Sequence, residues 1–319
     1  MSDFRDDFIA HITENRCLGN LEQSIPCVSF CPSHVDIPGY IALVADGRYD
    51  DAVQLIRKDN PFPTACAFVC EHPCETNYRR NMVDDAINIR ALKRYAVDHG
   101  GHVPAPTTAP VTGKQVAVIG GGPSGMTAAY YLQLMGHQVT VYERLGYLGG
   151  MLRYGIPSYR LPRQRLDDDL NHILATGVRV KFGVNVGTDV TLENLLEQYD
   201  AVYLSIGAHT DKKLKIEGEN ADGVMSAVEM LRRIGEHNPP DFQGKRVVVV
   251  GGGNVAMDVA RSSIRLGAEK VTIAYRRRKK DMTALAEEVE GAVAEGIEVK
   301  TLMAPDRIDA DENNQVHGV

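Results

Sequence analysis

The chain has 319 residues, 44% of them hydrophobic and 24% charged, and a formal net charge of -7. This length allows two or three domains with buried cores, and the acidic balance argues against a general role in binding nucleic acid. The longest aliphatic run, at 247–250, is far shorter than a membrane span, and the acidic start MSDFRDDFIA has no apolar signal core. We therefore expect a cytoplasmic protein that binds neither nucleic acid nor membrane.

All six cysteines lie in the first quarter of the chain. In a reducing cytoplasm this clustering indicates metal or redox chemistry and not disulfides. Ordinary core cysteines would be scattered along the chain, so that alternative is the weaker one. The candidate ligands are Cys17, Cys27, Cys31, Cys66, Cys70 and Cys74.

The first 100 residues are predicted to be helical. Asp36 and Pro38 suit a helix start, and apolar residues recur at helical spacing between positions 41 and 56. Asn60 and Pro61 interrupt this pattern, and the segment GGHVPAPTTAP at 100–110 has the composition of a linker. A domain boundary there gives a cysteine-rich helical domain with its linker over residues 1–110.

From Lys114 the pattern changes to strand, glycine turn, helix and strand. Gly120, Gly122 and Gly125 form G-x-G-x-x-G, which allows a tight turn, a close approach to a pyrophosphate and close packing of helix on strand. Glu143 ends the following strand, where a carboxylate can accept hydrogen bonds from an adenosine ribose. The context predicts a bound dinucleotide, and the alternative is a glycine-rich turn without a ligand.

A second unit of this kind at 245–275 carries G-x-G-x-x-A, formed by Gly251, Gly253 and Ala256. Tyr275 takes the position of the carboxylate, and three arginines follow it. Guanidinium groups match a 2′-phosphate through forked, charge-assisted hydrogen bonds, so this turn favours NADP(H) over NAD(H). The alternative is a solvated basic run at the end of a strand.

Two turns with different ribose chemistry imply two different dinucleotides, FAD in the first and NADPH in the second. Hydride transfer between a nicotinamide and a flavin depends on positioning more than on acid–base side chains. The sequence contains no catalytic triad and no H-E-x-x-H motif. No catalytic side chain is therefore expected.

The other predicted elements complete an α/β fold. They are a helix at 163–176, strands at 178–182, 201–207, 297–302 and 306–310, the turn DENN and a returning strand QVHGV. We expect two Rossmann-like domains, FAD-binding over 111–215 and NADP-binding over 216–319. Because the last strand has barely returned, we expect the second domain to be incomplete and the chain to be part of a longer protein.

At these residues the chain resembles the small (beta) subunit of NADPH-glutamate synthase and, equally, the N-terminal half of dihydropyrimidine dehydrogenase and related iron–sulfur flavoproteins. The matching stretches, in the family's order, are RCLGN, PCVSFCPSHVDIPGYI, NPFPTACAFVCEHPCE, GGGPSGMTAAYYL, GGMLRYGIPSYRLP and GGGNVAMDVARSS. The resemblance implies a helical iron–sulfur domain before the two Rossmann-like domains. It also implies an oxidoreductase in which NADPH reduces FAD, and electrons pass singly to a [4Fe-4S] centre and on to a partner. That partner would be an electron-accepting catalytic subunit or a ferredoxin-like protein.

The resemblance also assigns the cofactor-binding residues. For FAD they are Gly120, Gly121, Gly122, Pro123, Ser124, Gly125, Glu143, Arg144, Gly150, Met151 and Arg160. For NADP(H) they are Gly251, Gly253, Asn254, Val255, Arg276 and Arg277. The family usually completes its FAD domain with a later G-D motif, which this sequence lacks.

The family usually holds two [4Fe-4S] clusters with eight cysteines. By resemblance, one cluster would draw on the positions of Cys17, Asn20, Cys27 and Tyr78, and the other on those of Cys31, Cys70, Cys74 and Lys93. The first set has lost two thiolates and the second only one. We therefore expect one cluster rather than two, with Cys66 or an exogenous group as its fourth ligand.

Two alternatives stay open. A disulfide reductase shares the plan of two dinucleotides but needs a C-x-x-C pair near the flavin, whereas the closest cysteines here are spaced C-x-x-x-C in the first domain. A non-catalytic adaptor could instead hold a structural zinc ion with Cys70, His72 and Cys74.

Overall fold

The computed structural model describes residues 25–100 and 103–319, and packing divides the chain into two compact units. Unit 1 contains the described residues up to Arg153 together with Arg160–Gly207. Unit 2 contains Tyr154–Tyr159 and Ala208–Val319, so it includes one short segment from the middle of the chain. The domain bounds expected at 110 and 215 stay a prediction.

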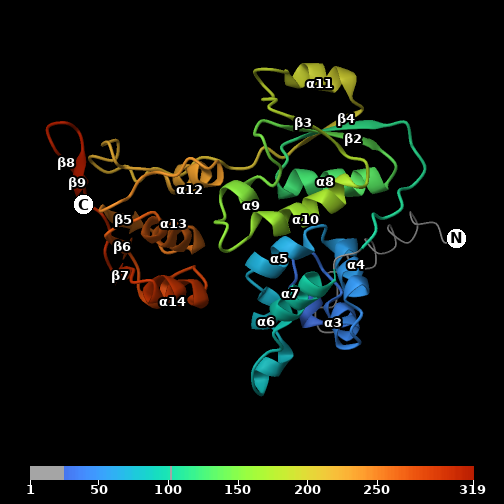
Figure 1. The fold of residues 1–319 in the computed structure, drawn as a ribbon, viewed down its shortest axis with the longest axis horizontal. Helices are drawn as coiled ribbons and strands as arrows, with labels where there is room; N and C mark the ends of the chain where they lie inside the picture. Colours follow the sequence, from blue (N-terminus) through green and yellow to red (C-terminus); the bar gives the residue numbers. More distant parts are fainter. Residues whose placement is uncertain (1–24, 101–102) are drawn as a thin grey trace. The chain divides into compact units, whose positions relative to one another are not determined.

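The first part of unit 1 is helical, as the sequence predicts (Figure 1). Its elements are α2 (Pro26–Ser29), α3 (Ile37–Ala45), α4 (Tyr49–Asp59), α5 (Pro63–Val69), α6 (Pro73–Thr76), η1 (Arg79–Met82) and α7 (Ile89–His99). The Asp36 side chain caps α3 by accepting a hydrogen bond from the Gly39 N–H at 3.0 Å. The predicted helix start at this position is therefore confirmed.

These helices pack around a common core. Tyr40, Ile56 and Ile89 are fully buried, and the Tyr40 hydroxyl donates to the Ile89 carbonyl oxygen at 3.2 Å. Cys27 and Cys74 belong to the same core. Burial of this apolar surface stabilises the segments that carry the two thiols.

The second part of unit 1 is a parallel sheet with the strand order β3-β2-β1-β4. Its elements are β1 (Gln115–Ile119), α8 (Pro123–Leu134), β2 (Gln138–Glu143), α9 (Met151–Tyr154), α10 (Arg163–Leu174), β3 (Arg179–Phe182), α11 (Leu192–Gln198) and β4 (Ala201–Leu204). Helices α8 and α10 lie on one side of the sheet and α11 on the other (Figure 1). Because β1 pairs with both β2 and β4, the strand order switches direction at the carboxyl end of β1, where sheets of this kind bind ligands.

The sequence-based bounds of two elements in this part need correction. The helix predicted over 163–176 ends at Leu174, and the strand predicted over 201–207 ends at Leu204. The Ser205 N–H still donates to the Ile119 carbonyl oxygen at 2.9 Å, and the chain then leaves the sheet. The apolar pattern of the sequence therefore continues past Leu204, where the pairing of β4 with β1 ends.

Unit 2 contains a parallel sheet with the strand order β5-β6-β7. Its elements are α12 (Ala227–Gly235), β5 (Arg246–Val250), α13 (Asn254–Arg265), β6 (Lys270–Tyr275), η2 (Lys279–Asp281), α14 (Ala286–Ala294), β7 (Glu298–Thr301), β8 (Asp309–Ala310) and β9 (Val316–Gly318). Helix α13 packs on β5 and β6, whereas Val248 and Val250 of β5 are exposed. Strands β8 and β9 pair antiparallel, which confirms the expected terminal hairpin.

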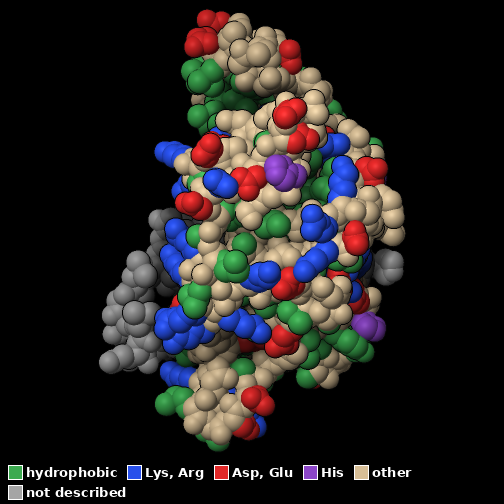
Figure 2. Space-filling view, turned by 90° about the vertical axis from the view of Figure 1, so that its left-hand side faces the viewer, with side chains coloured by type: hydrophobic (Ala, Val, Ile, Leu, Met, Phe, Trp, Pro, Cys, Tyr) green, Lys and Arg blue, Asp and Glu red, His purple; other side chains and the backbone are tan. Residues whose placement is uncertain are grey.

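The surface mixes charged and apolar side chains. Figure 2 shows basic, acidic and apolar side chains interspersed on the face that it draws. Among the helices of the described ranges, none combines the length and the apolar character that crossing a bilayer requires.

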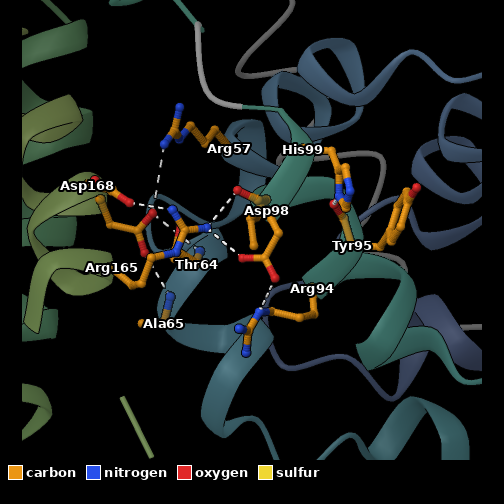
Figure 3. A network of polar contacts seen from close by, with 11 residues as sticks. Arg57, Thr64, Ala65, Arg94, Tyr95, Asp98, His99, Arg165 and Asp168 are labelled. Carbon is orange, nitrogen blue, oxygen red and sulfur yellow. Dashed lines mark hydrogen bonds and ion pairs between the residues drawn. The ribbon is translucent and has the colours of Figure 1, made fainter. Parts of the chain in front are cut away.

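A buried polar network joins the helical part of unit 1 to α10 (Figure 3). Asp169 of α10 has no exposed surface, and its carboxylate accepts hydrogen bonds from the N–H groups of Thr64 at 3.3 Å and Ala65 at 2.9 Å. Arg57 lies 3.8 Å from Asp169 and contacts Nδ1 of His172 at 3.3 Å. Because a guanidinium can only donate, Nδ1 of His172 is the unprotonated ring nitrogen.

Two pKa shifts in this network contribute to stability with opposite signs. Burial raises the pKa of Asp169 to about 6, and burial lowers the pKa of His172 to about 4. The contribution of Asp169 is fully present below its unfolded-state pKa of about 3.9 and is lost as the pH rises to about 6. The contribution of His172 is fully present above its unfolded-state pKa of about 6.5 and is lost as the pH falls to about 4. The two effects therefore oppose each other between these limits.

Replacing His172 by Gln should remove one of these effects and expose the other. Relative to the wild type, the free energy of unfolding of His172→Gln should fall by about 1–2 kcal/mol as the pH rises from about 4 to 6.5, a figure halved because the imidazole is partly exposed. Denaturant unfolding at several pH values measures this difference. The exposed His317, replaced in the same way, provides the control, and a pH-independent difference for His172→Gln would contradict the assignment.

Candidate functional site

The first glycine turn joins β1 to α8. Gly120 has a φ of +105°, and a side chain on it would collide with the carbonyl oxygen of Ser205. A side chain on Gly125 would collide with the carbonyl oxygen of Gly120, so the helix approaches the strand only with glycine at both positions. Gly122 is the N-cap of α8 and provides no side-chain acceptor, so N–H groups of the first turn can bind a phosphate.

Glu143 lies at the end of β2, beside this turn, and is 7% exposed. Its Oε2 accepts a hydrogen bond from the Gly121 N–H at 2.7 Å, and its Oε1 accepts one from the Leu145 N–H at 2.8 Å. Each carboxylate oxygen keeps a second acceptor position. Glu143 can therefore fix the turn and still accept a ribose hydroxyl.

Replacing Glu143 by Ala should weaken FAD binding by about 1.5–3 kcal/mol, the usual contribution of hydrogen bonds to a charged group. The loss has two sources, because the ribose loses an acceptor and the Gly121 N–H loses its partner. Titration of the apoprotein with FAD measures the change in Kd. Glu197→Ala, an exposed position on α11, is the control, and an unchanged Kd for Glu143→Ala would rule out the ribose contact.

The segment 145–151 lies over the first turn. The Gly149 N–H donates to the Gly121 carbonyl oxygen at 2.8 Å, and Leu148 and Gly150 pack closely against the glycines of the turn. The structure thus brings this segment to the same place as Glu143. The other residues expected here are exposed or half-buried, and their contact with FAD stays a prediction: Pro123, Ser124, Arg144, Met151 and Arg160.

Sequence reasoning missed two residues that support this turn. The Ser205 hydroxyl lies 2.8 Å from the Ile119 carbonyl oxygen and 3.1 Å from that of Gly120, so it fixes the end of β1. Arg153 is buried and donates from Nε to the Leu148 carbonyl oxygen at 2.6 Å, which holds the overlying segment. The position of Ser205 just after a strand was the available signal, whereas nothing local distinguishes Arg153 from a surface arginine.

The second glycine turn joins β5 to α13 in unit 2. Gly253 is the N-cap of α13 and again provides no side-chain acceptor. The Asn254 side chain accepts a hydrogen bond from the Leu285 N–H at 3.0 Å, so it ties the turn to the start of α14. Val255 is 50% exposed beside it. The turn therefore has the geometry of a phosphate-binding helix start.

Tyr275 ends β6 beside this second turn. Its ring packs against Gly252, and its hydroxyl donates to the Asp281 carbonyl oxygen at 2.5 Å. The strand end therefore presents a neutral side chain where the first unit has a carboxylate.

The arginines that follow Tyr275 are exposed and differ in their partners. Arg278 pairs with Asp281 at 2.8 Å and holds the pKa of that carboxyl below its ordinary value. Within residues 25–100 and 103–319, the side chains of Arg276 and Arg277 have no hydrogen-bond or ion-pair partner. Two guanidiniums thus remain available to an anionic ligand.

The described cysteines lie in three neighbouring segments of the helical part. They are Cys27 on α2, Cys66 on α5 and Cys74 on α6, with Cys31 and Cys70 just after α2 and α5. All are free thiols, Cys27 and Cys74 are buried, and α2 packs against α6. Cys17 lies outside the described residues.

The buried thiol of Cys74 lies close enough to two other thiols for them to affect its pKa. Burial raises the pKa of Cys74 to about 11, Lys93 opposes this shift, and Cys70 and Cys31 add to it. The His72 N–H donates to Sγ of Cys70 at 3.3 Å, a contact of the kind that tunes cluster sulfurs. These three thiols are the set that the resemblance assigns to one cluster.

Cys31, Cys70 and Cys74 provide free thiols at three of the four positions that the resemblance assigns to one cluster. Among the described residues, no three His, Cys, Asp or Glu side chains form a group that could hold a metal ion. To hold a cluster, these thiols would therefore have to approach a common centre and lose their protons on binding. Lys93 is 7% exposed, and a protonated amine cannot be the fourth ligand.

The imidazole of His72 is engaged elsewhere. Its Nδ1 lies 3.2 Å from the Cys70 carbonyl oxygen, and its Nε2 lies 3.6 Å from Glu75. A zinc site formed by Cys70, His72 and Cys74 would need one of these nitrogens. The geometry therefore does not favour the zinc alternative.

Two family models match the chain. Residues 114–319 match the pyridine nucleotide-disulphide oxidoreductases, and residues 6–103 match domain II of dihydropyrimidine dehydrogenase, a 4Fe-4S cluster domain. The chain is 43% identical to subunit beta of the NADPH-Fe(3+) oxidoreductase of Geobacter sulfurreducens, with 99% of the chain and 49% of that protein covered. It is 36% identical to the small chain of NADPH glutamate synthase of Escherichia coli, with 92% and 65% covered.

The fold is also shared with solved structures. FprA from Mycobacterium tuberculosis has a TM-score of 0.55 at 23% identity, with 65% of this chain and 62% of that chain covered. The comparisons confirm the resemblance, the α/β fold class and the expected cofactors FAD, NADP(H) and a [4Fe-4S] cluster, whereas the number of clusters stays a prediction. The chain belongs to the pyridine nucleotide-disulphide oxidoreductase family and joins that family's two-dinucleotide module to a 4Fe-4S domain.

Proposed function

We propose that this chain carries electrons from NADPH through FAD to an iron–sulfur centre and on to a partner protein. The observation that carries the proposal is the pair of glycine turns, which differ in the residue placed to contact the ribose of a bound dinucleotide. The first has Glu143 at its edge, and the second has Tyr275 followed by the exposed Arg276 and Arg277. The chain spans about half the length of the Geobacter relative, so the activity of the whole protein is an inference.

The residues of the chain provide positions and charges. A bound flavin accepts two electrons as a hydride from the nicotinamide and can release them one at a time. The turn at 120–125 would hold the pyrophosphate of FAD and Glu143 its ribose, while Arg276 and Arg277 would select a 2′-phosphate. Cys31, Cys70 and Cys74 would hold the cluster.

The names of two relatives support an electron-accepting partner. They are named as a subunit beta and as a small chain, which are parts of larger enzymes. We infer that this chain also delivers its electrons to another protein, either a catalytic subunit or a ferredoxin-like carrier. Affinity purification from the native source, followed by reduction of the captured protein with NADPH, would test this step.

Anaerobic rapid mixing with NADPH or NADH tests the electron path itself. NADPH should bleach the oxidised-flavin absorbance first and then reduce the cluster, and NADH should do so more slowly. Flavin bleaching without any change in the cluster signal would overturn the proposed transfer from FAD to iron. Equal rates with the two nucleotides would overturn the assignment of the second turn.

A further inference from the structure

Helix α10 contacts the segment that covers the first glycine turn. Leu166 of α10 packs against Gly149, and Asp167 pairs with Arg153, the residue that holds the Leu148 carbonyl oxygen. Arg163 donates from Nη1 to the Leu152 carbonyl oxygen at 3.2 Å. One side of α10 is thus tied to the segment where FAD is expected.

The same helix also contacts the helices that carry the cysteines. Asp169 accepts hydrogen bonds from the first N–H groups of α5, and Arg165 donates to the Val97 carbonyl oxygen of α7 at 2.7 Å. Arg165 also pairs with Asp98 at 3.0 Å (Figure 3). Helix α10 therefore connects the flavin-side segment to α5 and α7 within unit 1.

The carboxylate of Asp169 replaces a cap that α5 lacks. No side chain of the residue preceding α5, Phe62, accepts a hydrogen bond from this helix. A helix of two turns is marginal without tertiary support, and a carboxylate at its first N–H groups stabilises it. Cys66 lies on this helix and Cys70 follows its last residue, so the support acts on a cysteine segment.

We propose that Asp169 is a positioning residue that holds the Cys66–Cys70 segment in place relative to the flavin-side turn, an inference that rests on the function proposed above. Electron transfer depends on the separation of the two centres, so a residue that fixes this separation controls the rate of cluster reduction. It has no reason to alter the earlier hydride transfer from NADPH to the flavin.

Hydrogen exchange of the Asp169→Asn variant, followed peptide by peptide, tests the positioning role on the whole chain. The amide side chain cannot accept at both positions, so exchange at 64–70 should become about tenfold faster while exchange at 115–134 changes less than about twofold. Asp168→Asn is the matched control, because Asp168 loses the same charge on the same helix but pairs with Arg165 at a 41% exposed position. Unchanged exchange at 64–70, or the same acceleration in both variants, would overturn the proposal.

Cluster reduction gives a second, independent result. In protein loaded with flavin and cluster, Asp169→Asn should slow NADPH-driven reduction of the cluster by about tenfold and leave bleaching of the flavin within about twofold. Equal slowing of both steps would assign Asp169 a general structural role and overturn the proposal. If the wild type shows no transfer to iron, the proposed function fails. The hydrogen-exchange result still shows whether Asp169 holds the segment 64–70 in place.

A double variant covers the case in which Asp169→Asn does not fold. That change leaves Arg57 buried without its carboxylate, which is strongly destabilising. Combining it with Arg57→Gln removes both charges together. The same local acceleration at 64–70 is expected, and its absence in a folded double variant would contradict the role of Asp169.

Discussion

Replacing Arg276 and Arg277 together by Ala is expected to lower kcat/KM for NADPH by about 10²–10⁴-fold. Each guanidinium can form charge-assisted hydrogen bonds to the 2′-phosphate, which contribute about 1.5–3 kcal/mol per residue. NADH lacks this phosphate, so its kcat/KM should change by less than about twofold. Initial rates of flavin reduction with both nucleotides measure the two effects.

A matched variant separates recognition from structure. Arg278 is the third arginine of the run, but its guanidinium is paired with Asp281. Arg278→Ala should therefore lose much less activity with NADPH than the double variant. Equal losses with NADPH and NADH in the double variant would show that Arg276 and Arg277 support the fold and do not recognise the 2′-phosphate of NADPH.

The elements that the sequence predicted correctly are those with local causes. The glycine turns are visible because the backbone needs glycine at Gly120 and Gly125, and Asp36 marks a helix start because it accepts a hydrogen bond from its own first turn. Parallel strands that follow such turns must also place Glu143 and Tyr275 beside them. Local chemistry therefore located both glycine turns and the residues at the strand ends beside them.

The residues that the sequence did not reveal depend on distant partners. Positions 167–169 are three consecutive aspartates, and only packing shows that Asp169 is fully buried while Asp168 is half-buried. The hydrogen-bond partners of Asp169, Thr64 and Ala65, lie 105 and 104 residues earlier in the chain. No periodicity within α10 contains that information.

The segment Tyr154–Tyr159 is a second case of this kind. The sequence places it between two elements of the FAD-binding domain, yet it packs with unit 2. The Arg265 guanidinium of α13 lies 3.9 Å from the centre of the Tyr159 ring, and Arg261 lies 5.0 Å from it. Burial raises the pKa of Tyr159 to about 12, so its hydroxyl is neutral at physiological pH. Cation–π contacts between residues about one hundred positions apart leave no local sequence pattern.

The cysteines allow a partial prediction, since spacing identifies the candidate ligands but not which of them share one centre. In the structure, Cys70 and Cys31 both add to the raised pKa of the buried Cys74, while Cys31 adds to that of Cys27 and Cys70 to that of Cys66. Lys93 adds a cation near Cys66 and Cys74. The number of clusters therefore stays a prediction, and the loss of two thiolates from one ligand set favours a single cluster.

Anaerobically purified protein is therefore expected to contain about four iron atoms and four sulfides per chain, the content of one [4Fe-4S] cluster. Cys70→Ser should lose most of this iron, because the change removes a thiolate that also accepts the His72 N–H. Cys27→Ala is the control, since Cys27 belongs to the set that has lost two ligands, and it should keep its iron. A loss in Cys66→Ala as large as in Cys70→Ser would identify Cys66 as the fourth ligand. About eight iron atoms per chain would show that Asn20 and Tyr78 are bypassed by other ligands, and full iron content in Cys70→Ser would refute the ligand set.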